Sequence, residues 1–76
     1  MESPITDQSC WDYINQNMWT VIPMDQDTFR NRSWTSIREL GPDISGNVYL
    51  AGILGNDGCR GYWDPQRQSG ALSPGA

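Results

Sequence analysis

Eight aromatic side chains dominate what this chain can fold into, because 76 residues offer few other means of filling a core. These residues are Trp11, Tyr13, Trp19, Phe29, Trp34, Tyr49, Tyr62 and Trp63. A domain of this size buries only about 60% of the surface that its unfolded chain exposes. Each large aromatic side chain can bury roughly 150–250 Å². We therefore expect one small folded domain and not a disordered chain.

The N-terminal region has the periodicity of an amphipathic helix. Trp11, Ile14 and Met18 fall at positions i, i+3 and i+7, which share one helix face. Asp7 or Ser9 can cap the start of this helix, since short polar side chains accept hydrogen bonds from its first free amides. The sequence therefore predicts a helix of about three turns at this end of the chain.

Strand signals follow the helix. Residues 19–22 are rich in β-branched and aromatic side chains and end at a proline, whereas residues 24–32 have the composition of a polar connection. Residues 33–40 fit either a helix or a strand, and we prefer the strand because Trp, Thr, Ser and Ile favour one. The clearest element is a β-hairpin with strands near 48–54 and 59–63, joined by the glycine-bounded loop 55–58.

These elements predict an α+β fold, with an N-terminal amphipathic helix packed on a small antiparallel sheet. The expected domain spans residues 1–63. Residues 64–76 change to Pro, Gly, Ser, Ala and Gln, which is typical of a flexible tail without a core of its own.

The net charge of −4 is unevenly distributed. Residues 1–29 carry five acidic and no basic side chains, whereas residues 30–76 carry five arginines and four acids. Direct nucleic-acid binding requires clustered positive charge, so we do not expect it. An acidic region permits contact with a protein partner that has a basic surface. The alternative is that the acids only keep a small protein in solution.

Catalytic and metal-binding groups are scarce. The chain has no histidine and no lysine, and its two cysteines stand 49 positions apart. A zinc quartet and a Ser-His or Cys-His pair are therefore excluded. The run Asp25-Gln26-Asp27 begins like a calcium loop, but Phe29 and Arg30 occupy positions that such a loop needs for a ligand and a glycine. We expect no enzyme activity, no metal and no cofactor.

Targeting signals are also missing from the start of the sequence. Residues 1–4 lack a basic region and an apolar core, and the longest apolar run, residues 48–54, is too short to span a bilayer. We therefore expect a cytoplasmic protein without membrane contact, in the host cytoplasm if a phage encodes it. In that compartment the sequence favours free thiols at Cys10 and Cys59 over a disulfide.

Together these features predict a non-catalytic protein-binding accessory protein of a phage or mobile element. We expect it to inhibit a host nucleic-acid-binding enzyme, such as a CRISPR effector, a restriction enzyme or RNA polymerase. The expected contact residues are acidic, aromatic and basic side chains: Asp7, Asp12, Asp25, Asp27, Tyr62, Trp63 and Arg60.

Two alternatives stay open. Tyr62 and Trp63 fit an anchor in a partner pocket and equally fit the core of a small sheet. The whole chain also fits a structural subunit of a large assembly such as a virion, held by the hairpin edge and the tail.

Overall fold

The computed structural model describes residues 6–16 and 18–73. In chain order the elements are α1 (Asp7–Gln16), β1 (Thr20–Pro23), α2 (Gln26–Arg30), β2 (Ser36–Leu40), β3 (Tyr49–Ile53), β4 (Cys59–Asp64) and β5 (Ser69–Leu72). The α+β class expected from the sequence is confirmed, because α1 packs on an antiparallel sheet of five strands.

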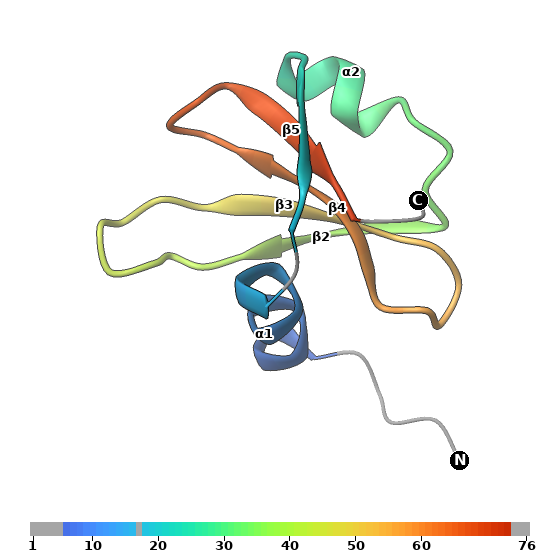
Figure 1. Cartoon of the computed structure of the whole chain (residues 1–76), viewed down its shortest axis with the longest axis horizontal. Helices are drawn as coiled ribbons and strands as arrows, with labels where there is room; N and C mark the ends of the chain where they lie inside the picture. Colours follow the sequence, from blue (N-terminus) through green and yellow to red (C-terminus); the bar gives the residue numbers. More distant parts are fainter. Residues whose placement is uncertain (1–5, 17, 74–76) are drawn as a thin grey trace.

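The strands lie in the order β1-β5-β4-β3-β2, and all neighbouring pairs are antiparallel. Strands β2 to β5 follow one another along the chain, while β1 pairs with the far side of β5. Figure 1 shows α1 on one side of the sheet and α2 on the other, with β1 turned steeply across the direction of β2. This turn reflects the twist that accumulates between neighbouring strands. The sheet is therefore covered on both faces, and β1 and β2 form its edges.

The expected hairpin is confirmed as β3 and β4. Two glycines in its loop, at positions 55 and 58, have φ of +58° and +88°, a left-handed conformation that glycine adopts without strain. The register shifts just before Ile53, which pairs with Cys59, while Ala51 pairs with Tyr62. Since Ala51 and Ile53 share one face, this β-bulge puts Cys59 and Tyr62 on that same face.

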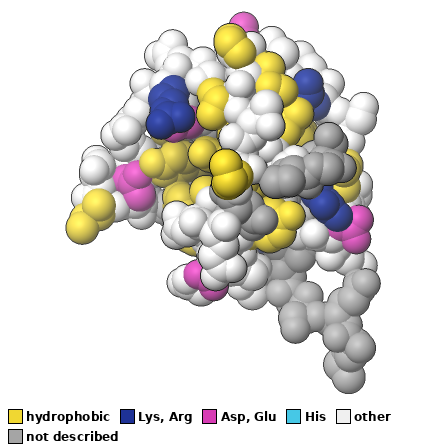
Figure 2. Space-filling model, in the orientation of Figure 1, with side chains coloured by type: hydrophobic (Ala, Val, Ile, Leu, Met, Phe, Trp, Pro, Cys, Tyr) yellow, Lys and Arg dark blue, Asp and Glu magenta, His cyan; other side chains and the backbone are white. Residues whose placement is uncertain are grey.

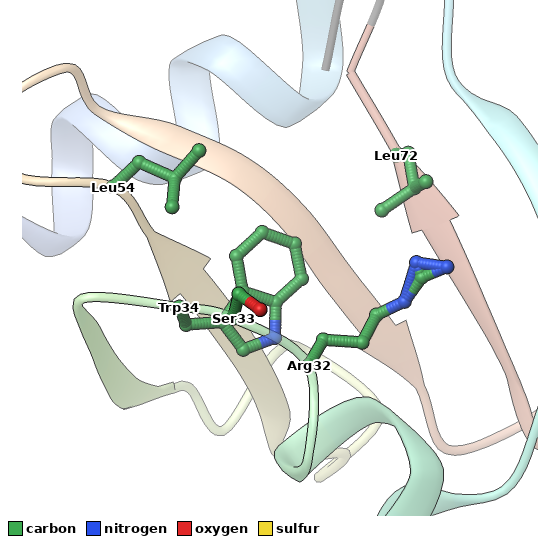
Figure 3. Close-up of a pocket in the computed structure, with 5 residues that line it drawn as sticks. All are labelled: Arg32, Ser33, Trp34, Leu54 and Leu72. Carbon is green, nitrogen blue, oxygen red and sulfur yellow. The ribbon is translucent and has the colours of Figure 1, made fainter.

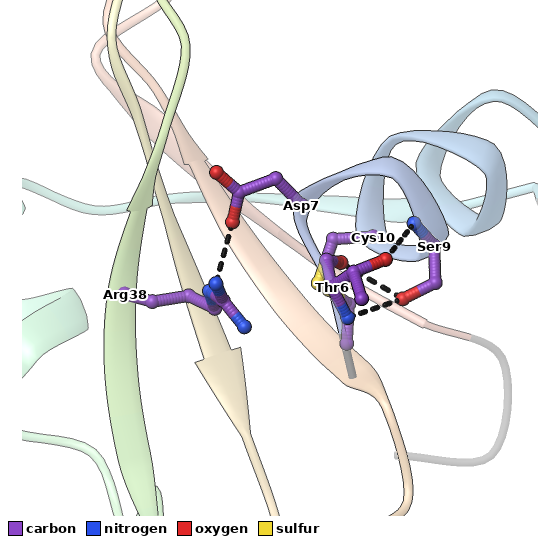
Figure 4. A network of polar contacts seen from close by, with 6 residues as sticks. Thr6, Asp7, Ser9, Cys10 and Arg38 are labelled. Carbon is purple, nitrogen blue, oxygen red and sulfur yellow. Dashed lines mark hydrogen bonds and ion pairs between the residues drawn. A yellow bond between two sulfur atoms is a disulfide. The ribbon is translucent and has the colours of Figure 1, made fainter. Parts of the chain in front are cut away.

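Helix α1 begins at a cap that lies one residue earlier than expected. The backbone N–H of Thr6 donates to Oγ of Ser9 at 2.9 Å, and the N–H of Ser9 donates to Oγ1 of Thr6 at 3.1 Å (Figure 4). This reciprocal pair satisfies amides that the helix itself leaves free. Asp7 occupies the first turn instead of the cap, where its negative charge faces the positive end of the helix dipole.

The preference for a strand within residues 33–40 is confirmed by β2, but the polar connection expected at residues 24–32 is wrong. This segment contains α2. Asp25 caps the helix by accepting a hydrogen bond of 2.7 Å from the N–H of Thr28, and hydrogen bonding with the side chain and the backbone N–H of Thr28 lowers the pKa of Asp25. Phe29 is fully buried. A helix of five residues is too short to show periodicity, so burial of one aromatic ring decides its structure.

The flexible tail expected from residue 64 onward is also wrong for the residues that the structure describes. Residues 69–72 form β5, which pairs with β4 on one side and β1 on the other. Gly70 and Ala71 are buried there, and the Met24 side chain lies directly on Gly70. Small residues in this strand therefore make room for neighbours, although their composition is typical of a tail. Residues 74–76 lie outside the described part of the chain.

A disulfide joins Cys10 in α1 to Cys59 in β4, so the expected free thiols are wrong. The two Cα atoms are 5.6 Å apart, and both residues are only 1% exposed. With Leu40 and Ala51 they form the buried core between α1 and the sheet. The amphipathic pattern of α1 brings Cys10 onto the face that packs on β4, a tertiary contact that spacing along the sequence does not reveal.

Reduction of this disulfide should lower the free energy of unfolding by about 2–4 kcal/mol, since it removes a cross-link that closes a loop of 49 positions. The measurement is urea unfolding followed by circular dichroism, with and without a dithiol reductant present throughout unfolding and refolding. The matched control is the Cys10→Ala/Cys59→Ala variant, whose transition the reductant should leave unchanged. An unchanged midpoint for the fully reduced parent chain would contradict the role given to the disulfide.

Candidate functional site

The face of the sheet opposite α1 is built around a row of small residues. The register pairs Gly52 with Gly61, and Gly70 lies on the same face further along the sheet, where it pairs with Trp63. The indole ring of Trp34 lies against Gly52 and Gly61, so that a Cβ atom added at Gly61 would fall 2.6 Å from Cη2 of the ring. No real Cβ contact is that short. The two glycines therefore create the space in which the Trp34 ring sits.

The position of the Trp34 ring is fixed by further contacts. Its Nε1–H donates to the backbone carbonyl of Phe29 at 2.9 Å, and the two rings lie 5.2 Å apart at an angle of 40°. The backbone N–H of Trp34 donates to the carbonyl of Arg32 at 2.7 Å. A half-buried ring held on one side by backbone and by a hydrogen bond loses little conformational freedom when it binds a partner.

A hollow of about 550 Å³ lies beside this ring and opens to solvent. Its lining residues are Arg32, Ser33, Trp34, Leu54 and Leu72. Figure 3 shows the Trp34 ring between Leu54 and Leu72, with the Arg32 side chain extending toward Leu72. The loop after α2, the end of β3 and the end of β5 thus each contribute to one site.

Charge in the hollow comes from Arg32 alone among its lining residues. Arg32 is exposed, and it forms no ion pair of 4.0 Å or less with any residue that the structure describes. Arg32 and Trp34 belong to residue types that are enriched in protein-binding hot spots, and the two leucines add apolar surface beside them. The arrangement can hold a ligand that is mostly apolar and carries a negative group.

The acidic residues expected to contact a partner do not gather on one surface. Asp7 and Asp12 lie on α1, whereas Asp25 and Asp27 lie at α2, on the other side of the sheet (Figure 1). Figure 2 likewise shows acidic side chains scattered over the face in view. A flat partner surface can therefore meet one pair of these carboxylates at a time.

Asp7 and Asp12, the two acids on α1, contact other side chains of this chain. Asp7 forms an ion pair of 2.6 Å with Arg38 in β2 (Figure 4). Oδ1 of Asp12 accepts a hydrogen bond of 2.9 Å from the side chain of Gln8. Both carboxylates are exposed, so these contacts contribute little to stability.

Tyr62 and Trp63 point to opposite faces of β4, because successive side chains alternate along a strand. Tyr62 lies on the α1 face, where its ring packs edge-to-face on Trp19 at 5.1 Å, and burial raises its pKa. Trp63 lies on the Trp34 face, with its Nε1 buried and without a hydrogen-bond partner among the described residues. Arg60 pairs with Asp57 at 3.6 Å. The three residues therefore do not form one anchor.

Tyr49, which lies among the described residues, has a strongly raised pKa, and its contacts are structural. Its hydroxyl donates to Oδ2 of Asp43 at 2.6 Å, and this bond, with burial, raises the pKa of Tyr49 to about 12. The same bond lowers the pKa of Asp43, whose Oδ1 also accepts from the N–H groups of Ser45 and Asn47. The protonated Tyr49 hydroxyl therefore holds the loop between β2 and β3 in place through its hydrogen bond to Asp43.

Sequence reasoning missed Arg32, Trp34, Leu54 and Leu72. The signal that could have found Trp34 is the even spacing of the glycines at positions 52, 55, 58 and 61. Two of them face the same side of paired strands and leave a space that only a large flat side chain fills. Leu54 and Leu72 gave no signal in the sequence, because they come close in space only through the strand register and the formation of β5.

Among the residues that the structure describes, no group of three or more His, Cys, Asp or Glu side chains could hold a metal ion. None of the helices in the described part of the chain is long and apolar enough to cross a membrane. Comparison with protein-family models, curated proteins and solved structures finds no significant match to this chain.

The fit between Gly61 and Trp34 predicts a strong coupling between these positions. Gly61→Ala should destabilise the parent by about 1–3 kcal/mol, because the added methyl group overlaps the ring. In a Trp34→Leu background the same change should cost clearly less, because the remaining close contact of the new Cβ is with the backbone carbonyl of Ala71 at 3.2 Å. Urea unfolding of the four proteins in this double-mutant cycle measures the coupling.

The control for this cycle is Gly55→Ala. Gly55 has φ of +58° and open space around its Cβ position, so its substitution strains only the backbone. Its cost should be the same with Trp34 or leucine at position 34. A Gly61→Ala cost that is also independent of residue 34 would show that the ring does not occupy the glycine row.

Proposed function

We propose that this chain is a non-catalytic protein that acts by binding another protein. The observation that carries the proposal is the Trp34 ring, held rigidly at the wall of an open hollow beside Arg32, which has no ion pair among the described residues. Rigid aromatic side chains and arginines supply most of the free energy of association at protein interfaces. The docking surface of the proposal is therefore the Trp34 face, and not the region of Tyr62 and Arg60.

The finer proposal is an accessory protein of a phage or mobile element that inhibits a host nucleic-acid-binding enzyme. It is supported by the net charge of −4 and by the exposed residues Asp25 and Asp27 at α2, the helix whose Phe29 ring packs on Trp34. Because Asp7 and Asp12 lie on the opposite side, the acidic part of the interface is limited to the α2 pair. A cytoplasmic location belongs to this proposal.

A structural subunit of a large assembly such as a virion is the second candidate, and two observations favour it. The Cys10–Cys59 disulfide is of a kind that persists in oxidising surroundings and is rare in the cytosol. The edge strands β1 and β2 each have one side without a partner strand among the described residues, so they could receive a neighbour's strand. This candidate replaces the inhibitor and its cytoplasmic location, but not protein binding itself.

A photo-crosslinking residue at position 33 should capture the partner. Ser33 is exposed and lines the hollow, so a cross-linker there reaches whatever occupies the hollow. The control position is Gln66, which is exposed in the turn between β4 and β5, away from the lining residues. In cells that make the protein naturally, we expect one defined adduct from position 33 and none from position 66, identified by mass spectrometry. Equal adducts from both positions, or none from position 33, would refute docking at this face.

The identity of the captured protein separates the two candidates. A nucleic-acid-binding enzyme supports the inhibitor, and a component of a particle supports the structural subunit.

Charge substitution tests the acidic contact with the captured partner. Asp25→Asn/Asp27→Asn should slow association, most strongly at low salt, because exposed charges are screened within about 10 Å at 0.1 M ionic strength. Asparagine at position 25 retains a side chain that caps α2, so the fold is kept. The matched variant Asp7→Asn/Asp12→Asn should bind like the parent. An association rate that none of these changes affects, at any salt concentration, would remove the electrostatic contact from the proposal.

A further inference from the structure

The hollow beside Trp34 has a composition that specifies more than protein binding in general. We propose that it binds an extended peptide segment of a partner protein in which one acidic residue is flanked by aliphatic residues. This inference rests on the proposed function and adds the chemistry of the segment that is recognised.

The apolar part of the inference follows from three side chains. Leu54 and Leu72 are both half-buried and lie on either side of the Trp34 ring (Figure 3). The exposed parts of the two leucines and the Trp34 ring form one continuous apolar wall of the hollow. A ligand that covers this wall removes apolar surface from water, which favours binding. Trp34 is already fixed by Gly52 and Gly61, so little entropy is lost when aliphatic side chains pack on it.

The open shape of the hollow favours a peptide segment that runs across it over a small ligand that it would enclose. A volume of about 550 Å³ lies within the range of small-molecule sites, about 300–1,000 Å³. Such sites usually enclose their ligand, whereas this hollow is open to solvent. A peptide whose chain continues in both directions can place two or three side chains in it without having to end there.

The acidic residue of the segment follows from Arg32. Its guanidinium group has five N–H donors in a planar fork, which matches the two oxygens of a carboxylate. Arg32 is the one charged residue among those that line the hollow, and no described carboxylate pairs with it. A segment with a carboxylate at this position therefore gains a contact with Arg32 that no carboxylate in the described part of the chain makes.

The charge of the whole chain limits the segment to a single acid. The protein carries a net charge of −4, and Asp25 and Asp27 lie at α2, whose Phe29 ring packs on Trp34. Further negative charges on the segment would add to the repulsion from a chain whose net charge is −4. The same repulsion disfavours the phosphate backbone of a nucleic acid.

The test is a titration of the intact, disulfide-bonded protein with short synthetic peptides, followed by NMR. The first probe is an acetylated and amidated peptide of sequence Ser-Leu-Glu-Leu-Ser, which has one carboxylate between two leucines. We expect saturable shifts of the Trp34 indole N–H and of the Leu54 and Leu72 methyl groups. A second probe with Gln in place of Glu should bind about two- to fivefold more weakly, the effect of one exposed ion pair.

Protein variants assign this difference to Arg32. In Arg32→Gln the Glu and Gln peptides should bind equally, because the carboxylate has lost its partner. Arg30→Gln is the matched control: Arg30 is also an exposed arginine, but it does not line the hollow. The preference for Glu should remain in that variant. Both positions are exposed, so neither substitution disturbs the core.

Four results would overturn the inference. The first is the absence of a saturable shift at Trp34, and the second is equal binding of the Glu and Gln peptides by the parent. The third is a preference for Glu that is unchanged in Arg32→Gln. The fourth is tighter binding of a peptide that is not amidated and whose only carboxylate is its C-terminus. The proposed function fails separately, through the cross-linking outcome at Ser33. If position 33 captures a protein but the peptides do not bind, protein binding stands and the peptide chemistry is wrong.

Discussion

The packing of the Trp34 ring on Gly52 and Gly61 is the contact on which this half of the molecule depends. The central strands β3, β4 and β5 need cover on two faces, and α1 covers only one of them. On the other face a one-turn helix and a loop take the place of a second long helix. A flat ring lying on glycine backbone covers both paired strands at once, which no smaller side chain in this segment could do.

The α1 face uses covalent reinforcement instead of a close-fitting ring. Cys10 is the one buried residue of α1, and its bond to Cys59 ties the helix to the centre of the sheet. Around it, edge-to-face contacts link Trp11 to Tyr49 and Trp19 to Tyr62. These rings pack on one another at the α1 side, whereas the hollow lined by Arg32, Leu54 and Leu72 lies at the Trp34 side. This difference between the faces is why we assign binding to the Trp34 face.

The sequence carried enough information for the elements whose signals are local. The hairpin of β3 and β4 follows from alternating apolar residues around a glycine-bounded loop, and α1 from its helical spacing. Strand β5 could not be predicted, since Gly70 and Ala71 have the composition of a tail and become a strand only between β1 and β4. The disulfide and the hollow depend in the same way on register. Site prediction from composition favoured Asp7, Tyr62 and other conspicuous side chains, and it missed Arg32 and Trp34, whose importance comes from their neighbours.

The most direct measurement of the central claim is the NMR signature of the glycine row. If the indole ring lies on the backbone of Gly52 and Gly61, its ring current shifts their Hα resonances upfield, and nuclear Overhauser contacts join these protons to the Trp34 ring. We predict both effects in the oxidised protein, and Gly55 as an internal reference without either. Ordinary glycine shifts at positions 52 and 61, without contacts to Trp34, would contradict the account of this face and of the hollow beside it.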